Sequence, residues 1–353
     1  GSAWVNEGIL HESEARTNLV VYSEDFANAA WFKSNCSITA DAITSPDGTT
    51  NADKLIPNTS NASHFFVDTP DVPSAKNTAS IFAKAGEYSF LTITLEETGS
   101  SFVDAYFNLS TGVVGTIASG VTATIESVGN DWYRCSATST NANTIQAYFG
   151  ACVADNTKSF SGDGTSGIFV YGAQIEADST PSSYIPTSGS TVTRAAETLT
   201  VPAANLPYSS TNMSIQMDGK MTYTDDGDDN GKVFRWHLDS SNNIYSMLST
   251  YLARTGQIYW VQESGNVLDS VSGPDTSYSP DVNVPFNFAS RHGSTFLNGA
   301  IDGTALTANT TPTSLPDLSA TDLNLGYDFM GTIGKFRMWD EDLTDTGIAE
   351  AST

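Results

Sequence analysis

The chain has 353 residues, of which 39% are hydrophobic and 16% charged, a length and composition that predict about two globular domains. With 40 acidic and 15 basic residues the net charge is −25, which repels phosphate backbones and anionic lipids, so we expect no nucleic-acid and no membrane partner. The three cysteines are scattered and form no CxxC pair, which argues against a disulfide scaffold.

Alternation of apolar and polar residues, the pattern of half-buried β-strands, dominates the first half of the chain. The apolar sets of three such runs are Leu91, Ile93 and Leu95, then Val103, Ala105, Phe107 and Leu109, and then Ile145, Ala147, Phe149 and Ala151. Turn residues separate the runs. Short strands at this spacing predict an antiparallel sandwich and not a βαβ fold.

The polar faces of two of these runs hold the candidate ligand residues. Phe102, Asp104 and Tyr106 alternate with one apolar set, and Gln146 and Tyr148 alternate with another. An aromatic ring can stack on the apolar face of a sugar while planar polar groups bind its hydroxyls. These five residues are therefore predicted to bind carbohydrate. The alternative is that both sheet faces are buried and the rings belong to a core or an interface.

The stretch Gly172–Val201 divides the chain. It begins as a strand and then becomes rich in Pro, Ser, Thr and Gly, with Pro181 and Pro186 preventing ladder pairing. We predict an all-β protein of two tandem antiparallel β-sandwiches, residues 1–192 and 193–353. Tyr184 and Ile185 are expected to dock onto the first sandwich.

The second half repeats the strand pattern without repeating the sequence. Strands are expected at 213–217, 232–238, 244–252, 257–262, 287–291, 295–301, 322–325 and 331–339. Asn298-Gly299 predicts a hairpin turn, because both residues tolerate positive φ. The last residues predict one helical turn, with Leu343 and Ile348 docked on the domain.

An acidic run is the candidate metal site. Asp226, Asp228 and Asn230 match the first half of a calcium-binding loop, although the closing Glu is missing and His237 stands in its place. Calcium binding and a solvated hairpin tip are the two alternatives, and no cofactor is expected to be required. No P-loop, GxSxG or HExxH pattern is present, so we expect no enzymatic activity.

Several segments of the first half together resemble a carbohydrate-binding-module-like domain of tailed-phage structural proteins. The segments are EARTNLVVYSEDFANAAWFKSN, SPDGTTNADKL, SIFAKAGEY, FNLSTGVVGT, VGNDWYRCSAT and GAQIEADSTPSSYIPTSGSTVTRAAE. The resemblance implies a jelly-roll sandwich of galactose-binding type. It also implies that Trp31 and Trp132 are framework residues.

The second half is similar to concanavalin A-like (laminin G-like) sandwiches. The segments that carry the similarity are FNFASRHGSTFLNGAIDGT, LPDLSATDLNLGY and MGTIGKFRMWDEDLTDTGIAE. The E-x-D-x-x-E strand of that group's retaining glycosidases is absent, which puts an enzymatic role in doubt.

The two resemblances together imply a non-catalytic protein on the surface of a bacteriophage virion, in a tail fibre, spike or head appendage. Such a protein would bind polysaccharide or cell-surface glycan weakly through many copies, which implies a homo-oligomer and contacts with other virion proteins. One alternative is a purely structural decoration or adaptor protein without sugar binding. Another is the binding portion of a polysaccharide-degrading enzyme.

Overall fold

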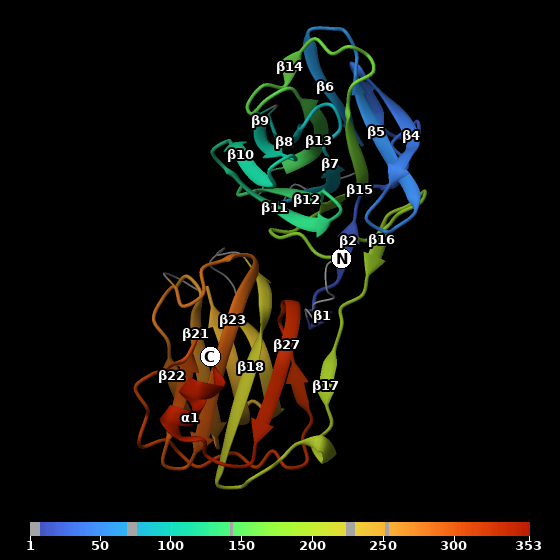
Figure 1. Ribbon diagram of the computed structural model, residues 1–353. Helices are drawn as coiled ribbons and strands as arrows, with labels where there is room; N and C mark the ends of the chain where they lie inside the picture. The colour runs from blue at the N-terminus through green and yellow to red at the C-terminus, as the bar shows by residue number, and fades with distance from the viewer. Residues whose placement is uncertain (1–7, 69–75, 100, 142–143, 224–229, 251–253) are drawn as a thin grey trace. The chain divides into compact units, whose positions relative to one another are not determined.

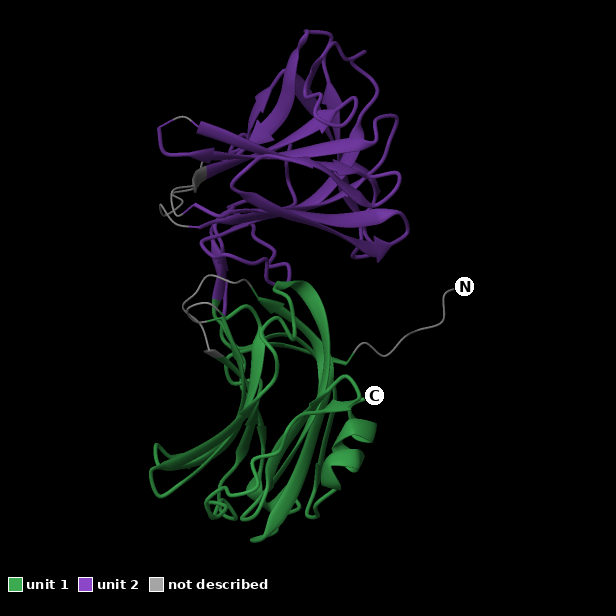
Figure 2. Cartoon of the chain, turned by 90° about the vertical axis from the view of Figure 1, so that its left-hand side faces the viewer, with its two compact units in different colours: residues 1–15, 195–353 green, residues 16–194 purple. Residues whose placement is uncertain are grey.

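The computed structural model describes residues 8–68, 76–99, 101–141, 144–223, 230–250 and 254–353 (Figure 1). The chain folds as two compact units, residues 16–194 and residues up to 15 together with 195–353 (Figure 2). We call them the first and the second sandwich. Both are built from antiparallel strands, so the predicted all-β class is confirmed.

The first sandwich consists of two antiparallel sheets. One sheet, which we call the pocket sheet, has the order β10 (Val113–Ile117), β9 (Ser101–Asn108), β8 (Phe90–Glu97), β13 (Thr144–Cys152), β6 (Ala62–Val67) and β14 (Ser159–Phe160). A further strand, β3 (Phe32–Ser34), pairs with the same edge of β6 as β14. The second sheet has the order β11 (Val121–Gly129), β12 (Trp132–Ser139), β7 (Thr78–Lys84), β15 (Ile168–Glu176), β5 (Thr50–Pro57) and β4 (Cys36–Thr44).

The core of the first sandwich lies between these sheets. The pocket sheet contributes Leu91, Ile93 and Phe149, and the second sheet contributes Ile81 and Val170, all of them fully buried. Leu91, Ile93 and Phe149 belong to the apolar sets that alternation predicts, because successive side chains of a strand point to opposite faces. The predicted polar set of β9 therefore lies on the outer face of the pocket sheet.

The second sandwich also has two sheets. The first has the order β1 (Ile9–Glu12), β27 (Met330–Trp339), β18 (Asn212–Tyr223), β23 (Asp281–Gly293), β24 (Leu297–Ile301) and β25 (Thr304–Ala305). The second has the order β17 (Leu199–Val201), β26 (Leu323–Leu325), β19 (Asn230–Asp239), β20 (Asn242–Ser249), β21 (Gln257–Ser264) and β22 (Val267–Ser272). The expected strands of this half are thus all found, with shifted ends.

One helix packs beside the second sandwich. It is α1 (Thr344–Ala351), whose Ile348 is fully buried against β23 and β24 residues, as the predicted docking of this tail requires. A short 3₁₀ turn, η1 (Ala203–Asn205), follows β17. No helix among the described residues has both the length and the apolarity needed to cross a bilayer.

The predicted hairpin at Asn298-Gly299 is wrong. Both residues lie inside β24, and the turn comes instead at Asp302 and Gly303, which have φ angles of 44° and 83°. Gly299 has a packing role, because a Cβ there would lie 2.1 Å from the Trp260 ring. Asn-Gly usually indicates a turn, but here the missing side chain of Gly299 lets the Trp260 indole pack against β24.

The predicted domain boundary also needs correction. Residues 8–15 do not join the first sandwich, because Ile9–Glu12 pairs with β27 of the second. The first sandwich is instead an insertion between β1 and β17, closed by the short pair β2 (Arg16–Asn18) and β16 (Val192–Arg194). The boundary after residue 192 is close to the observed one, after Arg194.

The docking predicted for the connector is confirmed. Tyr184 Oη lies 2.7 Å from Ser23 Oγ, and Ile185 is 4% exposed. The Ile185 amide donates a hydrogen bond to Gln174 Oε1, 2.7 Å away. This part of Gly172–Val201 therefore belongs to the first sandwich.

Candidate functional site

The candidate site lies on the outer face of the pocket sheet. Residues directly opposite each other in an antiparallel pair point to the same face. The register places Asp104 opposite Thr94, Thr94 opposite Tyr148, and Phe102 opposite Glu96. Strands distant in sequence thus bring together the side chains that alternation had placed on the polar faces.

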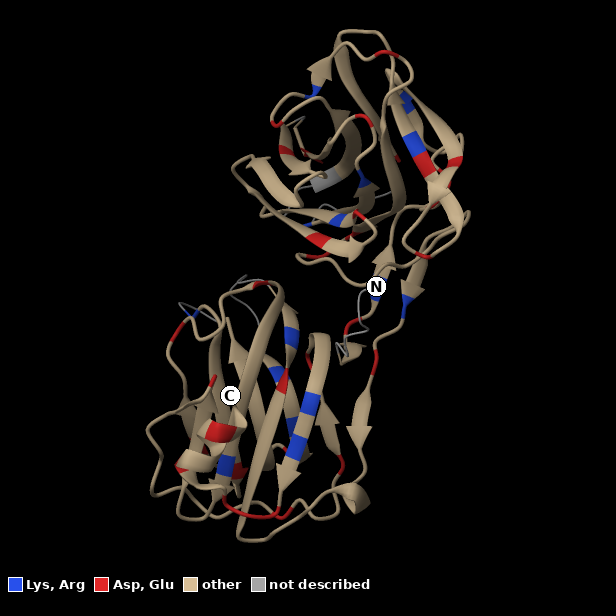
Figure 3. Cartoon of the chain, viewed as in Figure 1, with Lys and Arg blue, Asp and Glu red and all other residues tan. Residues whose placement is uncertain are grey.

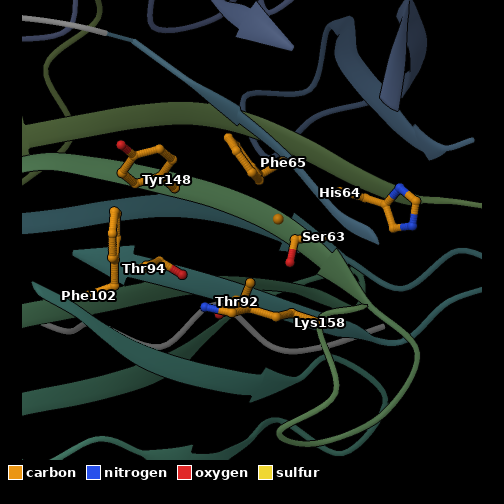
Figure 4. Close-up of a pocket in the computed structure, with 9 residues that line it drawn as sticks. Ser63, His64, Phe65, Thr92, Thr94, Phe102, Tyr148 and Lys158 are labelled. Atoms are coloured by element: carbon orange, nitrogen blue, oxygen red, sulfur yellow. The ribbon is translucent and has the colours of Figure 1, made fainter. Parts of the chain in front are cut away.

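A cavity of about 310 Å³ opens on this face (Figure 4). Its lining residues are Ser63, His64, Phe65, Thr92, Thr94, Phe102, Tyr148, Gly150 and Lys158. Four strands, β6, β8, β9 and β13, and the segment before β14 supply them. The volume is at the lower end of the range of small-molecule sites, about 300 to 1,000 Å³, so the cavity suits one sugar unit or one substituent.

Three aromatic rings wall the cavity. The Tyr148 ring lies between the other two, with its centroid 5.2 Å from Phe65 and 5.9 Å from Phe102, at interplanar angles of 81° and 68°. Phe102 is 51% exposed, an unusual state for a ring of this size. The exposed ring leaves an apolar surface available to a ligand.

The floor of the cavity is open because of Gly150. A Cβ at this position would lie 3.0 Å from Thr92 Cγ2 and 3.4 Å from Phe65 Cβ. A larger residue would therefore crowd its neighbours and fill the cavity. The His64 ring points away from the other labelled side chains (Figure 4), toward the backbone oxygens of Asn35 and Phe160, which lie 2.6 and 2.7 Å from its nitrogens.

One side of the site carries an ion pair. Lys158 Nζ lies 2.7 and 2.8 Å from the two carboxylate oxygens of Asp104. Thr94 Oγ1 donates a further hydrogen bond to Asp104 Oδ1, 2.5 Å away. The carboxylate is thus held by two neighbours, and the ammonium group is directed toward the cavity side of the sheet.

The other polar contacts involve Tyr148. Its hydroxyl contacts Glu96 Oε2 and lies 2.7 Å from Gln146 Oε1. Burial, followed by the bond to the Glu96 carboxylate, raises the pKa of Tyr148 above its ordinary value. The phenol therefore stays protonated at neutral pH, and Glu96 and Gln146 fix the orientation of its ring.

Four of the five predicted carbohydrate-binding residues gather here. Phe102 and Tyr148 line the cavity, while Asp104 and Gln146 contact lining residues. Tyr106 lies on the same face but is only 3% exposed, so it cannot offer a ring for stacking. Burial and the Asp104 carboxylate raise the pKa of Tyr106. We therefore remove Tyr106 from the set of candidate contacts.

Sequence patterns missed Phe65 and Lys158. Phe65 comes from β6. In this strand Ser63 and Phe65 alternate with the buried Phe66 and so point to the other face of the sheet, and this alternation could have predicted an outward Phe65. Lys158 lies in an irregular segment, and its ion pair joins positions 54 residues apart. No local pattern indicates a contact of that kind.

The predicted metal site lies outside the described residues. Asp226 and Asp228 fall in the undescribed stretch 224–229, and the side chain of Asn230 is not described either. Among the residues that the structure does describe, no group of three or more His, Cys, Asp or Glu side chains is arranged to hold a metal ion. Calcium binding at this run remains a prediction.

The framework role of the first-sandwich tryptophans agrees with their burial. Trp31 and Trp132 are 1% and 2% exposed, and their indole nitrogens donate to the backbone oxygens of Tyr22 and Thr44. In the second sandwich Trp236 and Trp260 are fully buried in the core.

Charged side chains are spread over both sandwiches (Figure 3). The basic positions lie on strands of both sandwiches, and acidic residues outnumber them 40 to 15 in the chain. Phosphate backbones bind to clustered basic residues. The charge distribution therefore gives no reason to change the prediction that nucleic acid is not a partner.

Comparisons with known proteins find similarity in structure alone. No family model matches the chain, and no curated protein matches it. An intramolecular trans-sialidase from leech shares 15% identity at a TM-score of 0.34, with 41% of this chain and 23% of that chain covered. The binding domain of botulinum neurotoxin serotype D shares 13% identity at 0.31, with 41% and 36% covered.

A third similar structure is the LG4-5 pair of the mouse laminin α1 chain, with 10% identity, a TM-score of 0.29, and 79% and 86% covered. This chain spans about a quarter of the trans-sialidase and about a third of the toxin domain. At these TM-scores the similarities assign neither a family nor a ligand. The class of the protein, two antiparallel β-sandwiches of which the first is inserted into the second, is defined by its own strand order and division into units.

Proposed function

We propose that this protein is a non-catalytic glycan-binding protein of a bacteriophage virion surface, part of a tail fibre, spike or head appendage. The observation that carries the glycan-binding part is the open cavity walled by Phe65, Phe102 and Tyr148 on the pocket sheet. The virion part is supported by the resemblance of several sequence segments to a domain of tailed-phage structural proteins.

The cavity has the two features that sugar binding uses. The half-exposed Phe102 ring can stack on the C–H face of a sugar, and the Tyr148 ring, inclined at 68° to it, limits the other side. Lys158 provides a hydrogen-bond donor at the rim. A site of this size binds weakly by itself, so several copies would supply the avidity, which is the reason we propose a homo-oligomer.

The state of the nearest carboxylates supports the proposal of binding without catalysis. Hydrolysis of a glycosidic bond needs one carboxyl group as a proton donor and another as a nucleophile or base. Asp104 is held by Lys158 and Thr94, and Glu96 is held by Tyr148. Neither carboxylate lines the cavity, which supports a role for these groups in orienting a ligand.

A glycan array with and without calcium tests the proposal. We expect binding to at least one bacterial or algal glycan, with loss of binding in Phe102→Ala and in Tyr148→Ala. Tyr327→Ala is the matched control, because it removes a ring of similar exposure, 45%, from the second sandwich. Absence of binding to every glycan, or an equal loss in the control, would refute the site.

Calcium separates the two candidate sites. The metal candidate at 226–230 belongs to the second sandwich, whereas the cavity belongs to the first. We therefore expect the same glycan binding with calcium and with a chelator. Loss of binding in chelator would contradict a metal-independent pocket.

A structural role without sugar binding is the second candidate. It is favoured by exposed apolar side chains on β10, the edge strand beside β9, where Val113 and Ile117 are 56% and 45% exposed. Apolar groups at a sheet edge also suit a protein partner. If Val113→Ser with Ile117→Ser abolishes assembly into particles while glycan binding is absent, this second function replaces the first.

A further inference from the structure

The polar side chains that line the cavity already have partners within the protein. Ser63 Oγ lies 3.1 Å from Ser159 Oγ, and Thr92 Oγ1 donates to the Ala105 oxygen 3.2 Å away. Thr94 is bonded to Asp104 and the Tyr148 hydroxyl to Glu96 and Gln146, as described above. What the cavity offers a ligand is therefore mainly ring faces and methyl groups.

Lys158 is the exception. An ammonium group has three N–H donors, and the two oxygens of Asp104 accept two of them at 2.7 and 2.8 Å. Among the described residues no third acceptor contacts Lys158 Nζ, so one donor is left at the cavity. The charge of the ammonium group is balanced by the Asp104 carboxylate, so the remaining donor belongs to an ion pair that has no net charge.

The apolar ring surfaces and the remaining Lys158 donor together favour a ligand group with a methyl group next to a hydrogen-bond acceptor. A sugar hydroxyl placed against Phe65, Phe102 and Tyr148 would lose water without gaining a partner, which is unfavourable. A methyl group placed there gains free energy through burial of its apolar surface. A carbonyl oxygen next to that methyl group would accept the remaining Lys158 hydrogen bond.

We infer that the cavity binds an acetylated sugar, with the acetyl methyl group between the three rings and its carbonyl oxygen accepting a hydrogen bond from Lys158. This inference rests on the proposed function and names the ligand class of the same site. Acidic sugars are disfavoured, because Asp104 and Glu96 place two carboxylates against one ammonium group near the cavity.

The test uses pairs of neutral glycans that differ only in the acetyl-bearing group. The full chain is titrated with the tetramers of β-1,4-linked N-acetylglucosamine and glucose, and with an O-acetylated polysaccharide before and after mild alkaline deacetylation. The acetylated member of a pair should bind about tenfold more tightly, the combined effect of one buried methyl group and one hydrogen bond.

Lys158→Met separates the two parts of the interaction, since it keeps a long apolar side chain and removes the donor. We expect this variant to retain the melting temperature of the parent within a few degrees and to reduce the preference for the acetylated glycan severalfold. Tyr327→Ala should leave the preference unchanged.

The outcomes distinguish the inference from the function beneath it. Equal binding of acetylated and unacetylated glycans, or an unchanged preference in Lys158→Met, overturns the acetyl assignment and leaves glycan binding intact. Absence of binding to any glycan on the array overturns the proposed function and the inference with it. A tenfold preference that falls in Lys158→Met supports both.

Discussion

Lowering the pH from about 8 to about 5 should change the stabilities of the two sandwiches in opposite directions. The second sandwich contains His292, fully buried in β23, where burial lowers its pKa to about 3 from an ordinary 6.5. The first contains Asp53, 2% exposed in β5, where burial raises the carboxyl pKa to about 6 from 3.8. The opposite shifts have opposite consequences for proton binding.

At about pH 5 the His292 side chain is protonated in the unfolded chain and neutral in the folded chain. Stability is therefore present above the unfolded pKa and falls as the pH drops below it, by about 2 kcal/mol at about pH 5. For Asp53 the folded chain binds the proton first. Stability is gained as the pH falls through the folded pKa, by about 1 kcal/mol at about pH 5.

Differential scanning calorimetry at the two pH values measures both effects, provided that each sandwich, with its own core, unfolds in its own transition. The variant His292→Gln identifies the unfolding transition of the second sandwich. It also removes the largest pH-dependent contribution to the stability of this sandwich. Asp53→Asn does the same for the first. Smaller contributions from Asp302, whose pKa is raised by burial, and from His237, whose pKa is lowered by burial, stay in both parent and variant.

The reasoning depends on the environment of His292. Its Nε2 lies 3.0 Å from Ser290 Oγ, and Nδ1 has no partner among the described residues. Desolvation is the cause of its pKa shift, and no carboxylate of the described part of the chain offsets it. If the difference between parent and His292→Gln is the same at both pH values, His292 is not buried as a neutral group and the argument fails.

Two further predictions concern the second-sandwich helix and the extent of the glycan site. Arg291→Ala should lower the free energy of unfolding by about 2 kcal/mol in urea titrations, because it removes charged hydrogen bonds. The Arg291 side chain is 12% exposed and is paired at 2.7 Å with both Asp342 and Asp345, which are 24% and 47% exposed. A loss below about 0.5 kcal/mol would contradict this. Phe32→Ala should weaken binding of a long oligosaccharide severalfold and leave binding of a monosaccharide unaffected. Phe32 is 62% exposed and lies four strands from Phe102, about 19 Å across the same face of the pocket sheet, so only a long ligand can reach both rings. Equal losses of affinity for both ligands would contradict this prediction.

Strand positions were predictable because they follow from a local rule. Alternation in 102–109 separated the buried Ala105 and Phe107 from the outward Phe102 and Asp104 without knowledge of the neighbouring strands. A second local rule, the turn preference of Asn-Gly, failed at Asn298-Gly299, where the reason for glycine is a tryptophan ring from β21 and not the backbone of a turn. A residue chosen for a distant contact gives a misleading local signal.

The site was predictable to the extent that its residues share a strand. The sequence assigned Phe102 and Tyr148 to outward faces, but only the order β9, β8, β13, β6 makes them neighbours and adds Phe65. Tyr106 shows the opposite limit: its position in the alternation is right, yet neighbouring segments cover it to 3% exposure. Outward orientation in a strand is necessary for ligand contact and does not ensure it.

The strand Ile9–Glu12 shows why the division into two units could not be predicted from the sequence. Ile9–Glu12 is four residues long, and its exposed residues are Ile9 and Leu10 while the polar His11 and Glu12 are buried, the reverse of the usual pattern. Its place is fixed by tertiary contacts: His11 Nε2 lies 2.9 Å from the Gly326 oxygen, and a Cβ on Gly326 would lie 2.4 Å from the His11 ring. Because this strand completes a sheet whose remaining strands follow residue 194, the second sandwich can close only after the whole first sandwich has been synthesised between its parts.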